Sequence, residues 1–152
     1  MKKLLALLVI PFFFAACDAI TGKEIARLKI NQVSTENNTV MKETTLNLKK
    51  DTEVSLWSDV DMKYNGDVQL RFRVEILKNG AAYDELDLDP TQKNITLGEI
   101  KTSINGKTDW SFFGKNGSMK IQEDGKYTFK GILVASDNPS LKITKAELVF
   151  KQ

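Results

Sequence analysis

The sequence contains no histidine, and its only cysteine is Cys17. Catalytic sites of the Ser-His-Asp and Cys-His types need a histidine to accept a proton, so neither type is available to this chain. The usual zinc, iron and copper sites draw their ligands from histidine and cysteine and are excluded for the same reason. We therefore expect a protein that is not an enzyme and that uses no metal or cofactor. A hydrolase that works with carboxylates alone is the remaining catalytic alternative.

Arginine and surplus positive charge are also scarce. The formal net charge is +2, from 22 basic and 20 acidic residues, and residues 1–16 contribute Lys2 and Lys3 but no acidic residue. The rest of the chain is therefore neutral. Its only three arginines are Arg27, Arg71 and Arg73. Nucleic-acid binding needs a basic surface that neutralises phosphates, so we expect no nucleic-acid partner.

Residues 1–17 contain the three parts of a bacterial export signal. Lys2 and Lys3 are basic, residues 4–14 are predominantly apolar, and small residues precede Cys17. The apolar run is shorter than the roughly 20 residues that a transmembrane helix needs. The ending Phe14-Ala15-Ala16-Cys17 resembles the lipobox of bacterial lipoproteins, in which Leu, a small residue and Gly or Ala precede the cysteine. Phe14 departs from that pattern but keeps a hydrophobic side chain.

The resemblance implies that residues 1–16 are a signal peptide and that Cys17 carries the lipid. Acyl chains contribute about 0.8 kcal/mol per buried CH2, so two or more of them anchor a protein without a spanning helix. Residues 17–23 would then form a short lipidated tether, and residues 24–152 a single domain. The resemblance also implies a bacterial cell-envelope protein whose partner is a membrane. We favour the outer membrane or cell surface over the inner membrane.

Short runs of alternating apolar and polar residues follow Ile25, separated by Gly, Asn, Asp and Pro. This period of two is typical of half-buried strands, and no stretch has a helical period. The pattern predicts an all-β domain, an antiparallel β-sandwich of about 8–10 strands. The run Glu123-x-Gly125-x-Tyr127 resembles the tyrosine corner of Ig-like domains. A jelly roll suits the strand count equally, so both topologies stay open.

Two irregular runs make more specific predictions. Residues 127–135 are apolar on both faces, which indicates a central strand. In residues 141–150 the apolar positions switch from odd to even, which predicts a bulge near Lys145.

The clearest pair of strands lies in residues 54–64 and 68–76, where the even positions are predominantly apolar. Facing residues of an antiparallel hairpin lie on the same side of the sheet. A three-residue loop, 65–67, satisfies this condition by placing Tyr64 opposite Val68. We therefore predict a hairpin with this loop.

The predicted hairpin also pairs opposite charges on its polar face. Asp61 falls opposite Arg71, and Asp59 falls opposite Arg73. We expect these to be exposed ion pairs.

Trp57 shares the predicted polar face with Asp59 and Asp61. An exposed tryptophan beside carboxylates suits a sugar, because the ring stacks on the pyranose face and the acids accept hydrogen bonds from its hydroxyl groups. The alternative is that another part of the chain covers Trp57, since tryptophan is usually well buried. Trp57, Asp59 and Asp61 are thus candidate ligand-binding residues.

Trp110 is the fourth candidate ligand-binding residue. It stands close to Phe112 and Phe113, and the three aromatic side chains would form either an exposed patch or a plug at one end of the core.

Four oxygen-bearing residues are spaced somewhat like a calcium-binding loop: Asp59, Asp61, Asn65 and Asp67. No glutamate stands at the closing position, and the hairpin gives two of the acids to arginines. We therefore predict charge pairs here and no metal site.

Together these observations predict a non-catalytic, lipid-anchored binding module whose ligand is a glycan or another envelope protein. The alternative is a structural accessory that contributes a sheet edge or face to an envelope complex. An exposed apolar patch in the folded domain would favour the accessory, and an aromatic groove lined with acids and amides would favour a glycan.

Overall fold

The computed structural model describes residues 21–152, so the predicted signal peptide, Cys17 and residues 18–20 of the tether lie outside the described residues. This part of the chain forms nine strands. They are β1 (Glu24–Lys29), β2 (Lys42–Leu48), β3 (Glu53–Asn65), β4 (Leu70–Lys78), β5 (Ala81–Leu88), β6 (Ile95–Ile104), β7 (Lys107–Lys120), β8 (Gly125–Ala135) and β9 (Lys142–Lys151).

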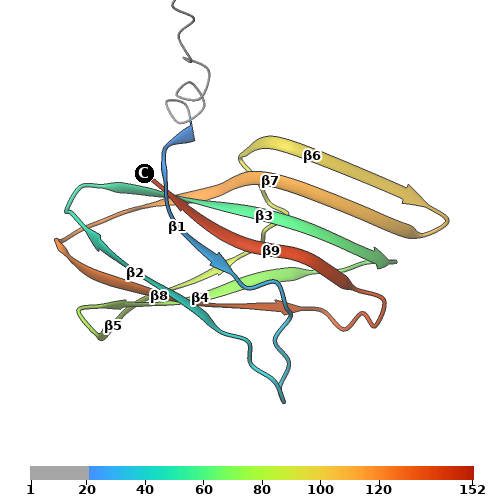
Figure 1. The fold of residues 1–152 in the computed structure, drawn as a ribbon, viewed down its shortest axis with the longest axis horizontal. Helices are drawn as coiled ribbons and strands as arrows, with labels where there is room; N and C mark the ends of the chain where they lie inside the picture. Colours follow the sequence, from blue (N-terminus) through green and yellow to red (C-terminus); the bar gives the residue numbers. More distant parts are fainter. Residues whose placement is uncertain (1–20) are drawn as a thin grey trace, which may run out of the picture.

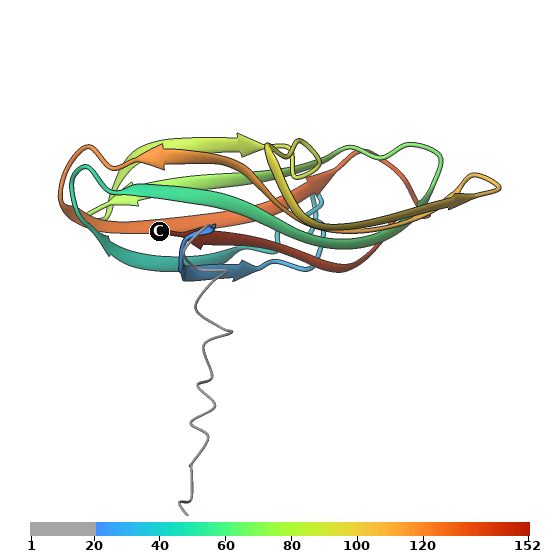
Figure 2. The ribbon, with the colours of Figure 1, turned by 90° about the horizontal axis from the view of Figure 1, so that it is seen from above.

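The strands form two antiparallel sheets that pack face to face (Figures 1 and 2). The five-stranded sheet has the order β1-β9-β3-β7-β6, and the four-stranded sheet has the order β2-β8-β4-β5. The predicted β-sandwich is thus confirmed.

Six strands have the neighbours found in an Ig-like sandwich. In that fold the strands B-E-D are adjacent in one sheet, and the strands F and C, with C′ in variable-type domains, are adjacent in the other. Here β3-β7-β6 and β8-β4-β5 occupy these places. The terminal strands differ, because β9 lies beside β3 and β2 lies beside β8. The topology is therefore Ig-like in its centre and rearranged at its ends.

The tyrosine corner supports the same assignment. Tyr127 is fully buried near the start of β8, the F equivalent, and its hydroxyl donates to the Glu123 carbonyl at 2.8 Å. The other two local predictions are also confirmed. β8 is central, between β2 and β4. β9 has its bulge beside Lys145, because Asp61 lies opposite Lys145 and Met62 opposite Ile143.

The predicted hairpin between residues 54–64 and 68–76 is wrong. β3 lies in the five-stranded sheet between β9 and β7, whereas β4 lies in the four-stranded sheet between β8 and β5. The even positions of both strands do face the core, as the alternation predicted. Because two strands on opposite sides of a core show the same alternation as two paired strands, the pattern could not separate the two arrangements.

The hairpins occur at two other Asn-Gly pairs. Asn79-Gly80 joins β4 to β5, and Asn105-Gly106 joins β6 to β7, each as a two-residue turn with positive φ at both positions. This conformation is the type I′ turn that matches the twist of antiparallel strands. Asn65-Gly66 instead begins the crossing from β3 to β4, and of its two residues only Gly66 has a positive φ.

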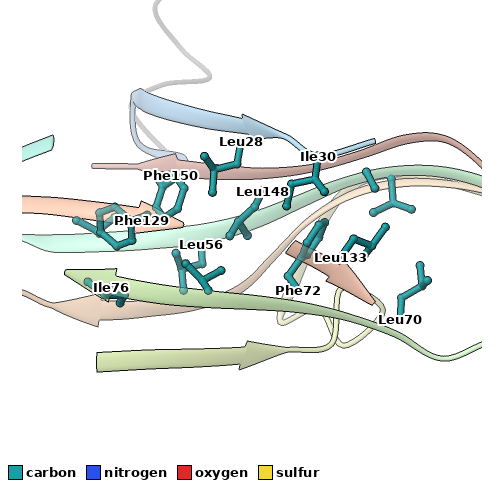
Figure 3. Packing of buried hydrophobic residues seen from close by; sticks show 14 of the residues in the cluster. Leu28, Ile30, Leu56, Leu70, Phe72, Ile76, Phe129, Leu133, Leu148 and Phe150 are labelled. Carbon is teal, nitrogen blue, oxygen red and sulfur yellow. The ribbon is translucent and has the colours of Figure 1, made fainter. Parts of the chain in front are cut away.

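The core lies between the two sheets, and Figure 3 shows how side chains from both of them interdigitate. Phe72 and Phe129 come from the four-stranded sheet, and Leu148 and Phe150 come from the five-stranded sheet. Every residue of this cluster lies within residues 25–150. A chain of residues 21–152 therefore contains every residue of this cluster and the nine strands described above, and we expect it to fold on its own.

Candidate functional site

Trp57, Asp59 and Asp61 share the outer face of the five-stranded sheet, the face turned away from the core, as the alternation predicted. Trp57 is nevertheless only 1% exposed, so of the two alternatives the structure has the one in which other parts of the chain cover the ring. Its ring stacks on Phe113 with the centroids 5.3 Å apart, and Lys151 Nζ lies 4.9 Å from its centroid. A buried ring cannot stack on a sugar, so Trp57 supports no glycan site.

Asp59 belongs to a charge cluster on the same face. Arg27 donates to Asp59 at 3.0 Å and to Glu147 at 2.6 Å, and Lys145 Nζ lies 3.2 Å from Asp59. Arg27 also donates to Glu24, and this hydrogen bond is the main reason why the pKa of the guanidinium is raised and that of Glu24 is lowered. The partners of Asp59 are therefore Arg27 and Lys145.

The predicted pairs of Arg71 and Arg73 with the acids of β3 are wrong. Arg71 lies 2.8 Å from Asp87 on β5, and Arg73 lies 3.9 Å from the same carboxylate. β5 is the neighbour of β4 in the four-stranded sheet, so the two arginines of β4 lie beside an acid of β5.

Two of the four residues considered for calcium lie in the loop after β3, and their backbone carbonyls accept hydrogen bonds. Asn138 Nδ2 donates to the carbonyls of Asn65 and Asp67, which fixes the loop after β3 against the loop before β9. Within residues 21–152 no three acidic side chains gather in a way that could hold a metal ion.

Trp110 lies on the inner face of the same sheet, opposite Met62, and is only partly buried. Its indole N–H donates to Glu99 at 2.7 Å, and Lys101 Nζ lies 3.8 Å from its ring centroid. The three aromatic residues of this segment divide between the two faces, because Phe112 is in the core and Phe113 packs on Trp57. The structure thus does not bring the four candidate residues together.

A surface that the sequence did not identify lies along β6. All ten residues of this strand are exposed, and among residues 21–152 it is a free edge of its sheet because β7 is its only neighbour there (Figure 1). Residues 21–152 have six exposed large hydrophobic side chains. Four of them lie on β6: Ile95 (48%), Leu97 (51%), Ile100 (74%) and Ile104 (65%).

Two of these side chains are on the outer face. Ile100 lies opposite Ser111 of β7, and Ser111 lies opposite Asp61 of β3, so Ile100 shares the face of Asp61. Ile104 is four residues further along the same regular pairing and points the same way. A shallow hollow adjoins Ile100 and is lined by Thr102, Ile100, Asp61, Lys63, Asp109, Ser111 and Thr144. The exposed apolar edge therefore continues into a polar, charged surface.

The inner face of β6 carries charge. Glu99 accepts hydrogen bonds from Trp110 and from Lys93 Nζ, which lies 3.1 Å away, and these two donors lower the pKa of Glu99. Lys101, two residues after Glu99 on the same face, extends over the ring of Trp110. Trp110 thus holds one acidic and one basic side chain beside the free edge.

The alternation of Ile95, Leu97, Ile100 and Ile104 with polar residues resembles that of any half-buried strand. Only the sheet order shows that nothing within residues 21–152 covers these side chains.

No protein-family model matches the chain, and no curated protein sequence is significantly similar to it.

Proposed function

We propose that this chain is a non-catalytic, lipid-anchored binding module of the bacterial cell envelope and that its ligand is a protein which docks along β6. The anchor is supported by the lipobox-like sequence Phe14-Ala15-Ala16-Cys17. The docking surface is supported by one observation, the concentration of exposed aliphatic side chains on a free sheet edge. The same observation favours the accessory alternative, in which this edge of the sheet is contributed to an envelope complex.

The chemistry of β6 suits a protein better than a glycan. A free edge presents backbone N–H and C=O groups that another strand can pair with, and alternate side chains then add specificity. Burial of isoleucine and leucine side chains against a protein lowers the free energy of the complex, but these side chains have no ring face on which a pyranose could stack. Trp57, which a glycan site would need, is buried, and the ring of Trp110 already has Lys101 beside it.

The domain begins only a few residues after Cys17, the proposed site of the anchor. Lys23 exchanges backbone hydrogen bonds with Gln152, and Lys151 Nζ lies 3.1 Å from the Thr21 hydroxyl oxygen. The chain is thus tied to β9 from Thr21 onward, four residues after Cys17. Four residues span at most about 14 Å, so a lipid on Cys17 would keep the sandwich against the membrane surface. Among residues 21–152 there is no helix of the length and hydrophobicity that a membrane span requires.

The anchor is tested with Cys17→Ala in the full chain. We expect the parent protein in the membrane fraction, released by detergent and not by salt, and the variant without the lipid and absent from that fraction after processing. A parent protein that stays soluble after cell breakage would contradict the anchor.

The docking surface is tested by photo-crosslinking in intact cells from a reactive residue at Ile104. The control has the same residue at Glu43, which is exposed on β2 in the other sheet. We expect a discrete protein adduct from position 104, none from position 43, and loss of the adduct when Ile100→Arg is added. Equal adducts from both positions would contradict docking along β6.

The glycan alternative is tested on residues 21–152 with a broad panel of polysaccharides. Binding that disappears in Trp110→Ala and survives Ile104→Arg would replace the proposal with a carbohydrate-binding function. We expect no binding to the panel.

A further inference from the structure

We infer that the protein which docks along β6 is a second copy of this chain, joined as an antiparallel β6–β6 pair with its two-fold axis at Ile100. This inference rests on the proposed function, because it identifies the partner of the surface proposed there. Such a pair would join the five-stranded sheets of the two copies into one continuous ten-stranded sheet.

The symmetry of a sheet-edge dimer restricts the registers that are allowed. A two-fold axis that relates antiparallel edge strands runs perpendicular to the sheet, so the outer faces of the two copies lie on the same side. Directly opposed residues must then share a face, and each contact occurs twice. The axis therefore passes between one residue and its own copy. Each possible register is defined by that central residue, and the registers can be compared one by one.

An axis at Ile100 opposes unlike charges. Glu99 and Lys101 flank Ile100 and share the inner face, opposite Phe112 and Trp110 of β7. In this register Glu99 of each copy lies opposite Lys101 of the other, so two opposite-charge pairs form across the axis. Pairs of this kind stabilise adjacent strands.

The neighbouring registers are less favourable. An axis at Glu99 places two glutamates opposite one another, and an axis at Lys101 places two lysines opposite one another, which destabilises a pair of strands. An axis at Thr102 avoids like charges but opposes Lys101 to Ser103, so it forms no opposite-charge pair. The axis at Ile100 lies at the centre of residues 98–102, the regular part of β6 that follows the bulge at Leu97, and of these four axes it alone opposes unlike charges.

The same axis also places the apolar residues well. Ile100 is 74% exposed, the most exposed large hydrophobic side chain of residues 21–152, and it would meet its own copy on the outer face. Gly98 would lie opposite Thr102, and an added Cβ at Gly98 meets no atom within 4 Å in the single chain. The edge is therefore open to a close backbone approach around the axis.

Trp110 prepares the charged pair on the inner face. Its N–H holds Glu99 at 2.7 Å, and Lys101 lies over its ring. The two side chains are thus already ordered on the inner face of β6 in one copy, which lowers the conformational entropy lost when the second copy binds.

The register is tested by disulfide formation in residues 21–152, which contain no other cysteine. Opposed residues of antiparallel strands have Cα atoms about 4.5–5.5 Å apart, which is within disulfide range. We expect Ile100→Cys to form a disulfide dimer under mild oxidation. The matched control, Ile104→Cys, is on the same face with similar exposure and should stay monomeric, because its copies would be about eight residues apart along the paired strands.

A mixing experiment tests the register independently. Gly98→Cys and Thr102→Cys should each crosslink poorly alone and readily when mixed. Equal crosslinking of Ile100→Cys and Ile104→Cys would show random collision and overturn the inference, as would absence of any product from Ile100→Cys.

The charge pairing is tested by sedimentation of the cysteine-free chain. We expect a concentration-dependent dimer, and Lys101→Glu, which opposes glutamates, should raise its dissociation constant about tenfold or more. The control Lys42→Glu, on an edge of the other sheet, should leave it unchanged. Circular dichroism verifies that both variants fold. Equal dissociation constants for parent and Lys101→Glu would overturn the inference.

The two proposals can fail separately. A specific adduct to a different protein from Ile104 in cells, without self-crosslinking of Ile100→Cys, would remove the second copy and leave the protein-binding function standing. No adduct in cells and no dimer in solution would remove both.

Discussion

Ser58 on β3 donates its hydroxyl hydrogen to Asn116 Oδ1 on β7 at 2.6 Å, and Ser58 is fully buried. The Nδ2 group of Asn116 lies within 3.2 Å of three carbonyl oxygens in the crossing between β5 and β6, those of Asp89, Pro90 and Gln92. Asn116 is the extra residue of a bulge, because Trp57 lies opposite Lys115 and Leu56 opposite Gly117. One amide therefore fastens the connection between the two sheets.

We predict that Asn116→Ala lowers the free energy of unfolding by about 2–3 kcal/mol, because the buried Ser58 hydroxyl loses its acceptor. Asn116→Asp should cost at least as much, since a carboxylate cannot donate to the three carbonyls. Urea denaturation of residues 21–152 measures both. Asn94→Ala is the control: the Asn94 side chain donates only to the exposed carbonyl of Asn116 and should cost less than about 1 kcal/mol. A small effect of Asn116→Ala would contradict its fastening role.

Trp57 supplies a second prediction, because the structure buries this side chain on the outer face of the sheet. Trp57→Ala should lower the free energy of unfolding by about 3–5 kcal/mol, as expected when a large aromatic side chain leaves a cavity. Trp110→Ala, at a partly buried site, should cost less. Denaturant unfolding of the two variants compares them, and equal small losses would show that the outer face around Trp57 is open to water.

Arg27 is expected to contribute more to stability than the other two arginines. It contacts three acids, and Glu147 among them is only 8% exposed, so Arg27→Ala leaves a nearly buried carboxylate without its cation. We expect a loss of about 1–3 kcal/mol, reduced from the fully buried case by the solvent that reaches Arg27. Arg73→Ala, whose side chain is 61% exposed, should cost less than about 1 kcal/mol. The reverse order in thermal or urea unfolding would contradict the cluster.

Acid should destabilise the domain through Glu24 and Glu99. The hydrogen bonds from Arg27 to Glu24 and from Lys93 and Trp110 to Glu99 lower both pKa values below the ordinary 4.5. A lowered pKa means that the stabilisation is fully present above about pH 4.5 and is lost as the pH falls through the folded value. The melting temperature, measured between pH 7 and pH 3, should therefore fall once the pH is below about 4.5. Glu24→Gln should flatten this drop, and an unchanged pH profile in that variant would contradict the assignment.

The local features of the fold could be predicted from the sequence because their causes are local. Alternation assigned the inner positions of β3 and β4 correctly, since the side-chain period of a strand depends on its own backbone. The spacing of Glu123, Gly125 and Tyr127 predicted the tyrosine corner, and the parity switch near Lys145 predicted the bulge in β9.

The choice of neighbouring strands could not be predicted in the same way. β3 and β4 are consecutive, alternate in step and are joined by an Asn-Gly sequence, yet they lie in different sheets. The charge pairs of Asp59 and Asp61 with Arg73 and Arg71 were consistent with the hairpin but depended on it. In the folded domain, Asp59 meets Arg27, which is 32 residues away in the chain.

The sequence by itself determined the class of fold, the face of most strands and the exclusion of catalytic sites that need histidine, because composition and side-chain period are properties of the chain. Tertiary structure alone decided that Trp57 is buried and that Ile100 is exposed. Both outcomes depend on which strands are neighbours. Phe113 and Lys151, from the strands on either side of β3, lie against Trp57, whereas β6 has a single neighbouring strand in the described part of the chain. Burial is set by the packing of segments distant in sequence, and no local pattern records it.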